Sequence, residues 1–314
     1  MKPLGRLLIT GGNGHLGRHL VEGLLPLFSD IILNSRKGAP HSGHSTNLSF
    51  RQADITDPAA VGRMFSELQP DYVIHAAALK NIAYAESHPL ECIKTNVYGS
   101  EIIAQAAIEN KCKAVIGISS TRAALPVMGM YAMSKSVMER LFHYFNESHV
   151  HFMSLRLGNL AWSPGSVLSE WEQMLHSSGC IQTRGFDMSR FFLNINDAIS
   201  FLKIICTDPE KFSGYTVVPQ MKMAKIEDVL KKFISKYGGK YEQVPSEIPE
   251  KKTDQLVGEA EERWATVMRL QGQQFFLIRP GVNGSGNISF ETTHMRESEI
   301  EEMIIKRPEK YKYI

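Results

Sequence analysis

Short apolar runs alternate, over the first half of the chain, with stretches whose apolar residues recur every three or four positions. The apolar runs predict six strands, at residues 7–10, 30–33, 49–52, 72–75, 114–118 and 152–155. The stretches between them predict helices at residues 15–25, 59–67, 90–109 and 131–146. Strands that alternate with helices pair in parallel beneath helices on both faces. The pattern therefore predicts an α/β fold with a Rossmann-type, doubly wound parallel sheet.

The second half of the chain has a less regular pattern. It predicts helices at residues 167–175, 195–205 and 226–236, an exposed loop at 238–252, and a solvated acidic helix face at 297–302. We therefore expect a cofactor-binding domain over residues 1–158. Residues 159–314 should form mainly a small C-terminal substrate lobe, with part of this half returning to the sheet.

Composition narrows the class of protein. Of the 314 residues, 43% are hydrophobic and 22% are charged, which is ordinary for a chain with a sizeable core. A net charge of +2 predicts no nucleic-acid partner and no anionic membrane partner. The four scattered cysteines predict buried thiols in a reducing compartment, and no spacing predicts a metal site. No apolar stretch predicts a signal peptide or a membrane span, so we expect a cytoplasmic protein.

A glycine-rich turn follows the first predicted strand and opens the first predicted helix. It contains Gly11, Asn13, Gly14, His15, Leu16 and Gly17. Glycines at this spacing let backbone N–H groups approach a pyrophosphate, which then lies at the positive end of the helix. The alternative is an ordinary glycine-rich turn, but its position between a strand and a helix favours a dinucleotide site.

The residues after the second predicted strand bear on the choice of cofactor. An NAD site usually has an acidic residue here for the ribose 2′-hydroxyl, whereas this chain has Ser35, Arg36 and Lys37. Their two cations favour NADP over NAD, unless both are solvated loop residues. Further cofactor contacts are expected where the third and fourth strands end, from Asp54 and Ile55 and from the small residues Ala76, Ala77 and Ala78.

Tyr131 and Lys135 lie four residues apart, on one face of a predicted helix. A phenol whose pKa is lowered by a nearby ammonium can exchange the proton of a substrate hydroxyl during hydride transfer. Ser120 and Thr121, at the end of the fifth strand, could bind the same substrate oxygen. We therefore predict a catalytic set of Tyr131, Lys135, Ser120 and Thr121, with Lys135 also at the cofactor. The alternative is a half-buried tyrosine and a surface lysine.

Five further stretches carry a resemblance to a known family. They are HAAALK at residues 75–80, HPLECIKTNV at 88–97, RLGNL at 156–160, GSV at 165–167 and DMSRF at 187–191. Together with the glycine turn and the Tyr–Lys pair, they resemble the extended short-chain dehydrogenase/reductases that act on nucleotide sugars. The chain looks most like the polysaccharide-biosynthesis branch of UDP-N-acetylglucosamine 4,6-dehydratases and related epimerases.

This resemblance implies NADP-dependent oxidation at C4 of a UDP-linked hexosamine. It implies substrate contacts from Asn159, Ser166, Val167 and Arg190, and places Lys80 and Asn96 beside cofactor and sugar. The alternative is that Asn159 and Asn96 only cap backbone groups and that Arg190 and Lys80 are surface cations. It also implies a homodimer or a larger assembly. Trp162 and Trp171 could stack on a uracil or lie in the core of the lobe.

The strand end departs from the family's dehydratases, which usually have an acidic residue and a lysine for elimination of water. This chain has Thr121 and Arg122 there, and a C-terminal family motif remains only at residues 248–251. A hydroxyl and a guanidinium are poor substitutes for an acid and a base. Three interpretations stay open: an epimerase or dehydratase type of enzyme, an NADPH-dependent UDP-4-ketosugar reductase, and an inactive NADP-binding regulator.

Overall fold

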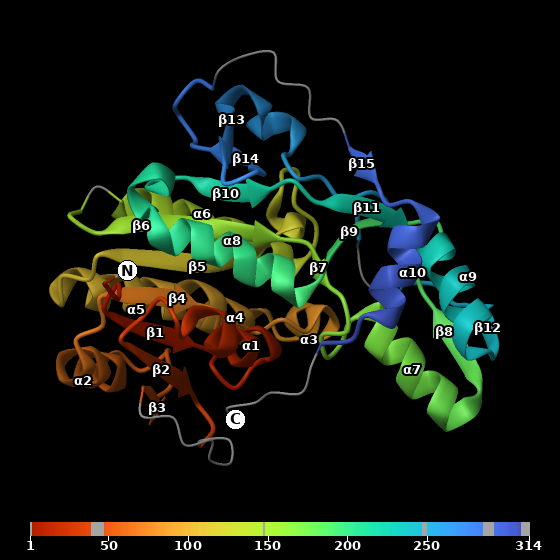
Figure 1. Ribbon diagram of the computed structural model, residues 1–314, viewed down its shortest axis with the longest axis horizontal. Helices are drawn as coiled ribbons and strands as arrows, with labels where there is room; N and C mark the ends of the chain where they lie inside the picture. The colour runs from red at the N-terminus through yellow and green to blue at the C-terminus, as the bar shows by residue number, and fades with distance from the viewer. Residues whose placement is uncertain (1, 39–46, 147, 247–249, 285–291, 309–314) are drawn as a thin grey trace.

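The computed structural model describes the chain except for residues 1, 39–46, 147, 247–249, 285–291 and 309–314. At its centre lies a nine-stranded sheet in the order β13-β14-β10-β6-β5-β4-β1-β2-β3 (Figure 1). The six predicted strands are confirmed, and they pair in parallel: β1 (Arg6–Thr10), β2 (Asp30–Ser35), β3 (Leu48–Gln52), β4 (Tyr72–His75), β5 (Ala114–Ser120) and β6 (His151–Leu157). Their order, 3-2-1-4-5-6, is that of a doubly wound Rossmann sheet.

The second half of the chain extends this sheet beyond β6. β10 (Thr216–Pro219) pairs in parallel with β6, and β14 (Gln273–Ile278) pairs with β10 in the antiparallel direction. β13 (Ala265–Leu270) then forms the edge beside β14. The sheet is therefore completed by residues far along the chain from the first six strands.

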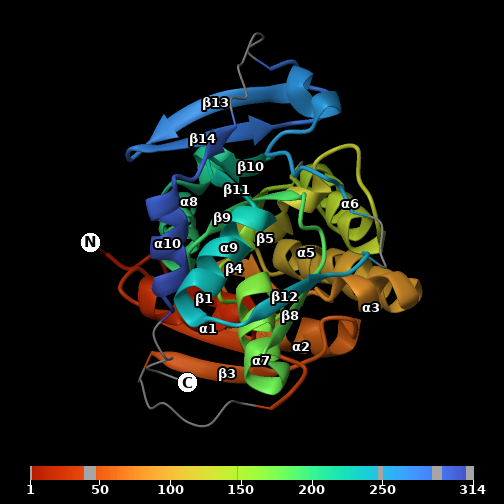
Figure 2. The ribbon, with the colours of Figure 1, turned by 90° about the vertical axis from the view of Figure 1, so that its right-hand side faces the viewer.

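Helices cover both faces of the sheet, and Figure 2 shows the two helix layers on opposite sides of the strands. α1 (His15–Leu24) and α8 (Ile195–Thr207) pack on one face, and α2 (Pro58–Leu68), α5 (Gly99–Glu109) and α6 (Met130–Phe145) on the other. Alternate residues of β1 serve the two cores, since Leu7 and Ile9 face the first and Leu8 the second. Burying one such side chain contributes about 1.5–3 kcal/mol, so both layers stabilise the sheet.

The helix predicted at residues 90–109 is a continuous run of three helical segments. α3 (Ile82–Ser87) ends before Pro89, which opens α4 (Pro89–Ile93); a π-helical turn, η1 (Lys94–Tyr98), then joins α4 to α5. The helix predicted at 131–146 is α6, and the side chain of Glu86 on α3 accepts a hydrogen bond from its first backbone N–H, at Met130 (2.8 Å). α3 thus fixes the start of α6.

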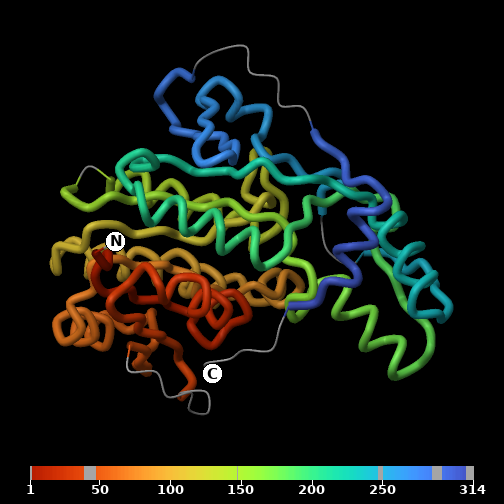
Figure 3. The backbone as a smooth tube through the Cα atoms, viewed as in Figure 1, coloured from red at the N-terminus to blue at the C-terminus, as the bar shows by residue number. Residues whose placement is uncertain are grey.

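A smaller lobe lies at the end of the sheet where β6 leads into β7 (Figure 1). Its strands are β7 (Asn159–Leu160), β9 (Ser189–Leu193), β11 (Lys222–Lys225) and β15 (Thr293–His294) in one sheet, and β8 (Cys180–Thr183) with β12 (Lys240–Gln243) in another. Its helices are α7 (Val167–Ser178), α9 (Ile226–Tyr237) and α10 (Glu297–Ile305). Figure 3 shows the chain entering the lobe three times, in green, cyan and dark blue, with returns to the main sheet between.

Several details of the second half differ from the sequence predictions. The segment 238–252, predicted as an exposed loop, contains the exposed strand β12, because its backbone pairs with β8. Trp162 and Trp171 pack in the core of the lobe with Phe233, and this burial excludes stacking of either ring on a uracil. All four cysteines are free; three are buried as expected, but Cys180 is half-buried because it begins the short strand β8.

Three short 3₁₀ segments complete the described chain: η2 (Thr121–Ala123), η3 (Pro209–Phe212) and η4 (Glu259–Trp264). η2 follows β5 directly, and η4 precedes β13. The acidic run at 297–302 lies on α10, which turns Ile300, Met303 and Ile304 into the core of the lobe. Among the helices that the structure describes, none has the length and apolar character needed to cross a bilayer.

Candidate active site

The glycine-rich turn packs tightly against the end of β4. Gly11 has a φ of +70°, and a Cβ at this position would lie 2.7 Å from the backbone N of Ala77. The same turn is held from β1, where Thr10 Oγ1 hydrogen-bonds to His75 Nδ1 (2.8 Å) and accepts from Ala77 N (3.3 Å). A Cβ at Gly17 would lie 2.7 Å from the carbonyl oxygen of Gly11. A side chain is therefore excluded at Gly11 and at Gly17, and the turn leads straight into α1 at His15.

The loop after β2 is tied to the glycine-rich turn. Asn13 Nδ2 donates to Ser35 Oγ (2.8 Å) and to the carbonyl oxygen of Gly38 (2.9 Å). Ser35 Oγ in turn donates to the carbonyl oxygen of Lys37 (2.7 Å), and both Arg36 and Lys37 are exposed. This loop therefore holds two cations beside the turn in which a dinucleotide is expected.

The other predicted cofactor residues follow at neighbouring strand ends. Asp54 Oδ1, after β3, accepts hydrogen bonds from the backbone N and the hydroxyl of Thr56, both at 2.9 Å. Ile55 is buried beside it. Burial first, and then the charges of His19 and Lys80, lower the pKa of His15 to about 4, so this imidazole is neutral at physiological pH.

Ser120, Tyr131 and Lys135 come together where β5 meets α6. The side chain of Ser120 hydrogen-bonds to the phenol of Tyr131, which is half-buried. Lys135 follows one helical turn later, is only 3% exposed, and donates from Nζ to the carbonyl oxygen of Ile118 (2.7 Å). Burial lowers the pKa of Lys135 to about 8, with the Glu139 carboxylate opposing the fall. The ammonium is thus close to its titration range near neutrality.

The pKa of Tyr131 differs from the sequence prediction. A neighbouring ammonium was expected to lower it, but burial of the phenol raises it instead. The cation that opposes this rise is the Arg122 guanidinium, and the hydrogen bond with Ser120 acts in the same direction. Arg122, at the position where the resemblance led us to expect a lysine, therefore contributes to the electrostatics of this phenol.

Segment 250–254 covers Thr121 and Arg122. Thr121 is buried, and its hydroxyl donates to Asp254 Oδ2 (3.3 Å). Arg122 Nη1 forms an ion pair with Glu250 Oε1 at 2.6 Å, and both side chains are largely buried. Lys251 Nζ contacts the carbonyl oxygen of Ala124. The strand-end hydroxyl and guanidinium are therefore held by carboxylates from the C-terminal part of the chain.

The remaining part of that C-terminal motif, Ile248 and Pro249, lies outside the described residues. Segment 250–254 also holds Arg190, which is 4% exposed. Arg190 Nη1 donates to the carbonyl oxygens of Ser189 (3.0 Å) and Lys252 (3.3 Å) and lies 3.7 Å from Asp254 Oδ1. Its guanidinium, predicted as a substrate ligand, is therefore paired within the protein.

Other predicted substrate residues lie at the junction between sheet and lobe. Asn159 Nδ2 donates to the carbonyl oxygen of Phe191 (3.0 Å), which joins β7 to β9. Lys80 is exposed and donates from Nζ to the carbonyl oxygen of Pro164 (2.9 Å), close in sequence to Ser166 and Val167 at the start of α7. These contacts connect the loop after β4 with the lobe.

Asn96 is buried, and its side chain binds other parts of the chain. Its Oδ1 accepts from the backbone N of Leu79 (2.7 Å), and its Nδ2 donates to the carbonyl oxygen of Leu79 (3.0 Å) and to Ser134 Oγ (2.9 Å). Asn96 therefore ties the loop after β4 to α6, between Tyr131 and Lys135. This arrangement favours a structural role for Asn96 beside the site.

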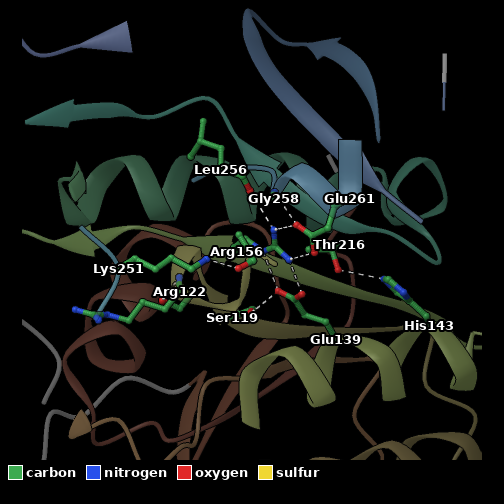
Figure 4. A network of polar contacts seen from close by, with 12 residues as sticks. Ser119, Arg122, Glu139, His143, Arg156, Thr216, Lys251, Leu256, Gly258 and Glu261 are labelled. Atoms are coloured by element: carbon green, nitrogen blue, oxygen red, sulfur yellow. Dashed lines mark hydrogen bonds and ion pairs between the residues drawn. The ribbon is translucent and has the colours of Figure 1, made fainter. Parts of the chain in front are cut away.

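Sequence reasoning missed a buried cluster of charges behind the site, which Figure 4 shows from close by. Arg156 on β6 is fully buried and lies between Glu139 of α6 and Glu261 of η4. Glu139 lies one turn beyond Lys135, and Arg156 belongs to the RLGNL stretch, so both positions carried a signal. Glu261 carried none, since it lies 105 residues from its partner.

The lobe also contains a cavity of about 270 Å³. It is lined by Thr183, Gly185, Phe186, Asp187, Met188, Gln243, Val244, Pro245 and Ser246. Met188 connects this cavity with Arg190, since its sulfur accepts a hydrogen bond from Nη2 of Arg190 (2.8 Å). The described residues include no group of three or more His, Cys, Asp or Glu side chains that could hold a metal ion.

The chain is similar in sequence to several known proteins. It is 28% identical over 299 residues to an uncharacterized membrane protein of Methanocaldococcus jannaschii, covering 90% of this chain and 88% of that protein. It is 29% identical over 236 residues to a UDP-N-acetylglucosamine 4,6-dehydratase (inverting) of Campylobacter jejuni, covering 71% of this chain and 69% of the dehydratase. The latter confirms the predicted resemblance to nucleotide-sugar dehydratases.

Solved structures share the fold. Pen from Bacillus thuringiensis superposes with a TM-score of 0.82 at 23% identity, and the match covers 96% of each chain. WbmG from Bordetella bronchiseptica, solved in complex with NAD and UDP, has a TM-score of 0.63 at 22% identity and covers 79% of this chain and 83% of its own. The sequence model of the polysaccharide biosynthesis protein family matches residues 7–263. The chain therefore belongs to the polysaccharide biosynthesis protein family.

Proposed function

We propose that this protein is an NADP-dependent enzyme that transfers hydride at C4 of a UDP-linked hexosamine during synthesis of polysaccharide or glycoconjugate precursors. The observation that carries the proposal is the meeting of Ser120, Tyr131 and Lys135 at the end of β5. β5 pairs in parallel with β4, and β4 with β1, so this set shares one edge of the sheet with the glycine-rich turn. Ligands of doubly wound sheets bind at that edge.

The residues present fit a nicotinamide dinucleotide. Gly11 and Gly17 have no room for a Cβ, and α1 begins directly behind the turn, as a pyrophosphate site requires. Arg36 and Lys37 offer positive charge for a 2′-phosphate. The solved relative WbmG binds NAD and UDP, which supports both kinds of ligand. A bound nicotinamide would supply the hydride acceptor and donor for C4 of the sugar.

The side chains of the site are suited to moving the proton of the 4-hydroxyl. Ser120 can donate a hydrogen bond to the sugar oxygen. As hydride leaves C4 and the ketone forms, the proton of the 4-hydroxyl can pass to the oxygen of Tyr131 in its phenolate form, which burial opposes and the Arg122 guanidinium favours. Lys135 is buried one helical turn after Tyr131, so its positive charge lies on the same face of α6 as the phenol. When the ketone is reduced, Tyr131 returns the proton to the oxygen.

The contacts of Thr121 and Arg122 favour a reaction that needs only hydride transfer at C4, without elimination of water. Elimination of water across C5–C6 needs a proton donor and a base near the sugar, but Arg122 is paired with Glu250 and Thr121 with Asp254. This observation supports epimerisation, which needs only the Tyr131 set. It supports equally a second candidate function, the NADPH-dependent reduction of a UDP-4-ketosugar.

Incubation with UDP-N-acetylglucosamine, followed by NMR of the sugar products, tests the proposal. Without added cofactor, we expect a 4-epimer, since bound cofactor would be recycled in each turnover. A 4-keto or unsaturated 6-deoxy product would instead assign dehydration. No product, together with oxidation of NADPH when a UDP-4-keto-6-deoxy sugar is supplied, would move the assignment to a reductase. Inactivity in both assays would contradict the proposal and favour the NADP-binding regulator.

Arg36→Ala should weaken binding of NADPH much more than binding of NADH. Loss of one charge-assisted hydrogen bond to a phosphate corresponds to about a 10- to 100-fold increase in Kd. NADH has no 2′-phosphate, so its Kd should change little. Fluorescence titration of both cofactors measures the two effects, with Arg63→Ala on the exposed face of α2 as the control. An equal loss for both cofactors would remove the basis for choosing NADP.

A further inference from the structure

The charge cluster behind the site consists of Glu139, Arg156 and Glu261, and we call it the Arg156 cluster. Arg156 donates to Glu139 from Nε (Oε1, 3.1 Å) and Nη2 (Oε2, 2.7 Å). It donates to Glu261 from Nη1 (Oε2, 2.9 Å) and Nη2 (Oε1, 3.0 Å). All three residues are at most 3% exposed. One guanidinium thus holds two carboxylates in fixed orientations, away from water.

The cluster reaches the end of β5 through Glu139. Ser119 Oγ donates to Glu139 Oε1 (2.6 Å), and Ser119 directly precedes Ser120 in the chain. One turn earlier on the same helix, Lys135 donates to the carbonyl oxygen of Ile118 (2.7 Å). These two contacts join α6 to β5 immediately before Ser120. They therefore determine how Tyr131, at the start of the helix, lies relative to the strand-end hydroxyl.

The cluster reaches the C-terminal part of the chain through Arg156 and Glu261. Arg156 Nη1 donates to the carbonyl oxygen of Leu256 (3.0 Å), and the backbone N of Gly258 donates to Glu261 Oε2 (2.9 Å). Gly258 packs so closely on Leu125 that a Cβ there would lie 2.0 Å from the Leu125 carbonyl oxygen. Residues 256–261 are thus docked on the segment that follows Thr121 and Arg122 (Figure 4).

We propose that Glu261 is a positioning residue for the catalytic set: through Arg156 it orients Glu139, and Glu139 holds Ser119 and the helix that carries Tyr131 and Lys135. This inference rests on the proposed function, because it takes Tyr131 and Lys135 as the reacting pair. It assigns an active-site role to a residue of the C-terminal half of the chain that itself touches neither ligand.

The cluster also affects the charge of Lys135. With two carboxylates and one guanidinium it carries one net negative charge, which favours the ammonium form of a buried lysine. The titratable groups that interact with Lys135 are Glu139 on its own helix, His75 on β4 and Cys92 on α4, and Arg156 on β6 is paired with Glu139. Burial lowers the pKa of His75 to about 3, so His75 adds no charge at neutral pH. Removing the charge of Glu261 leaves the cluster neutral.

The test is the pH profile of turnover in Glu261→Gln, which keeps the size of the side chain and removes its charge. Deprotonation of Lys135, whose pKa is about 8, should set the alkaline limb of kcat in the natural protein. In the variant this limb should move down by about one pH unit, the size expected for one lost charge at an effective dielectric constant of about 20. At pH 8 kcat should fall about fivefold, while KM for the sugar should change little. Glu262→Gln, on the exposed neighbour, is the matched control.

A second variant covers the case in which Glu261→Gln does not fold. Replacing Glu139, Arg156 and Glu261 together by Met leaves no unpaired charge in the core, and such apolar replacements are often tolerated. If the cluster only stabilises the fold, the apolar packing of the triple variant should restore turnover. If the cluster has a positioning role, kcat should stay low and the alkaline limb displaced.

Tyr131→Phe, assayed in parallel, distinguishes failure of the positioning role of Glu261 from failure of the proposed function. If Tyr131→Phe is inactive but Glu261→Gln or the triple variant has the natural kcat and pH profile, the positioning role is overturned and the proposed function stands. If Tyr131→Phe retains full activity, the proposed function itself fails, and the positioning role fails with it.

Discussion

Tyr131→Phe should lower turnover of the nucleotide sugar by about 10²- to 10⁴-fold, the usual contribution of a positioned acid–base group. The substitution removes only the phenolic oxygen, which hydrogen-bonds to Ser120 and can exchange the proton of the sugar 4-hydroxyl. The ring and the position of Lys135 are retained. Affinity for the cofactor should therefore be nearly unchanged. Steady-state kinetics and a cofactor titration on the same preparation measure both quantities.

Tyr144→Phe provides the matched control, because Tyr144 lies on the same helix and is 68% exposed. This variant should keep both turnover and stability. If Tyr131→Phe retained the turnover of the Tyr144→Phe control, the catalytic assignment would be wrong. If Tyr131→Phe lost cofactor binding as well, the phenol would instead be needed to build the cofactor site.

Arg156→Met should destabilise the protein by about 3–5 kcal/mol at pH 7, the usual effect of breaking a buried ion pair from one side. The substitution leaves Glu139 and Glu261 facing each other in the core without a cation. Arg63→Met, on the exposed face of α2, should change the free energy of unfolding by less than about 0.5 kcal/mol. Urea denaturation of both variants measures the difference.

The sign of the pH dependence provides a further check on Arg156→Met. Burial alone would raise the pKa of Glu261, but Arg156 outweighs burial in the natural protein and holds this pKa below its ordinary value. Without Arg156, the folded-state pKa values of both carboxyl groups should lie above their unfolded values. The stability that these two groups contribute is then lost as the pH rises, so the free energy of unfolding of the variant should be smaller at pH 8 than at pH 5. Natural stability at pH 7 would contradict a structural role for the cluster.

The parallel part of the sheet could be predicted from sequence because local signals determine it. Most of the first six strands are short apolar runs, and β1, β3, β4 and β5 each lead into helical segments, of which α1, α2, α5 and α6 pack apolar faces on the sheet. The strand β12 could not be predicted in this way. Its four residues are all exposed, and it forms because its backbone pairs with β8, about 60 residues earlier in the chain.

The site was predictable only where its residues are close in sequence. Tyr131 and Lys135 share one helix face, and Ser120 precedes them at a strand end. The partners of Thr121 and Arg122 come from more than 120 residues later, and a single sequence does not show such pairings. The contacts of Arg190 were also beyond sequence reasoning. Its role as a phosphate ligand stays a prediction, and the structure adds that Asp254 and two backbone carbonyls contact its guanidinium.

The lobe and the main sheet alternate along the chain, and this limits how new specificities can arise by recombination. Lobe strands β9, β11 and β15 come from three separate stretches, with α8, β10 and β14 of the main body between them. One crossover point therefore cannot transfer the whole lobe from a relative. A junction between β6 and η4 would also pair Arg156 of one parent with residue 261 of the other. Functional chimaeras should thus favour parents that match at both positions.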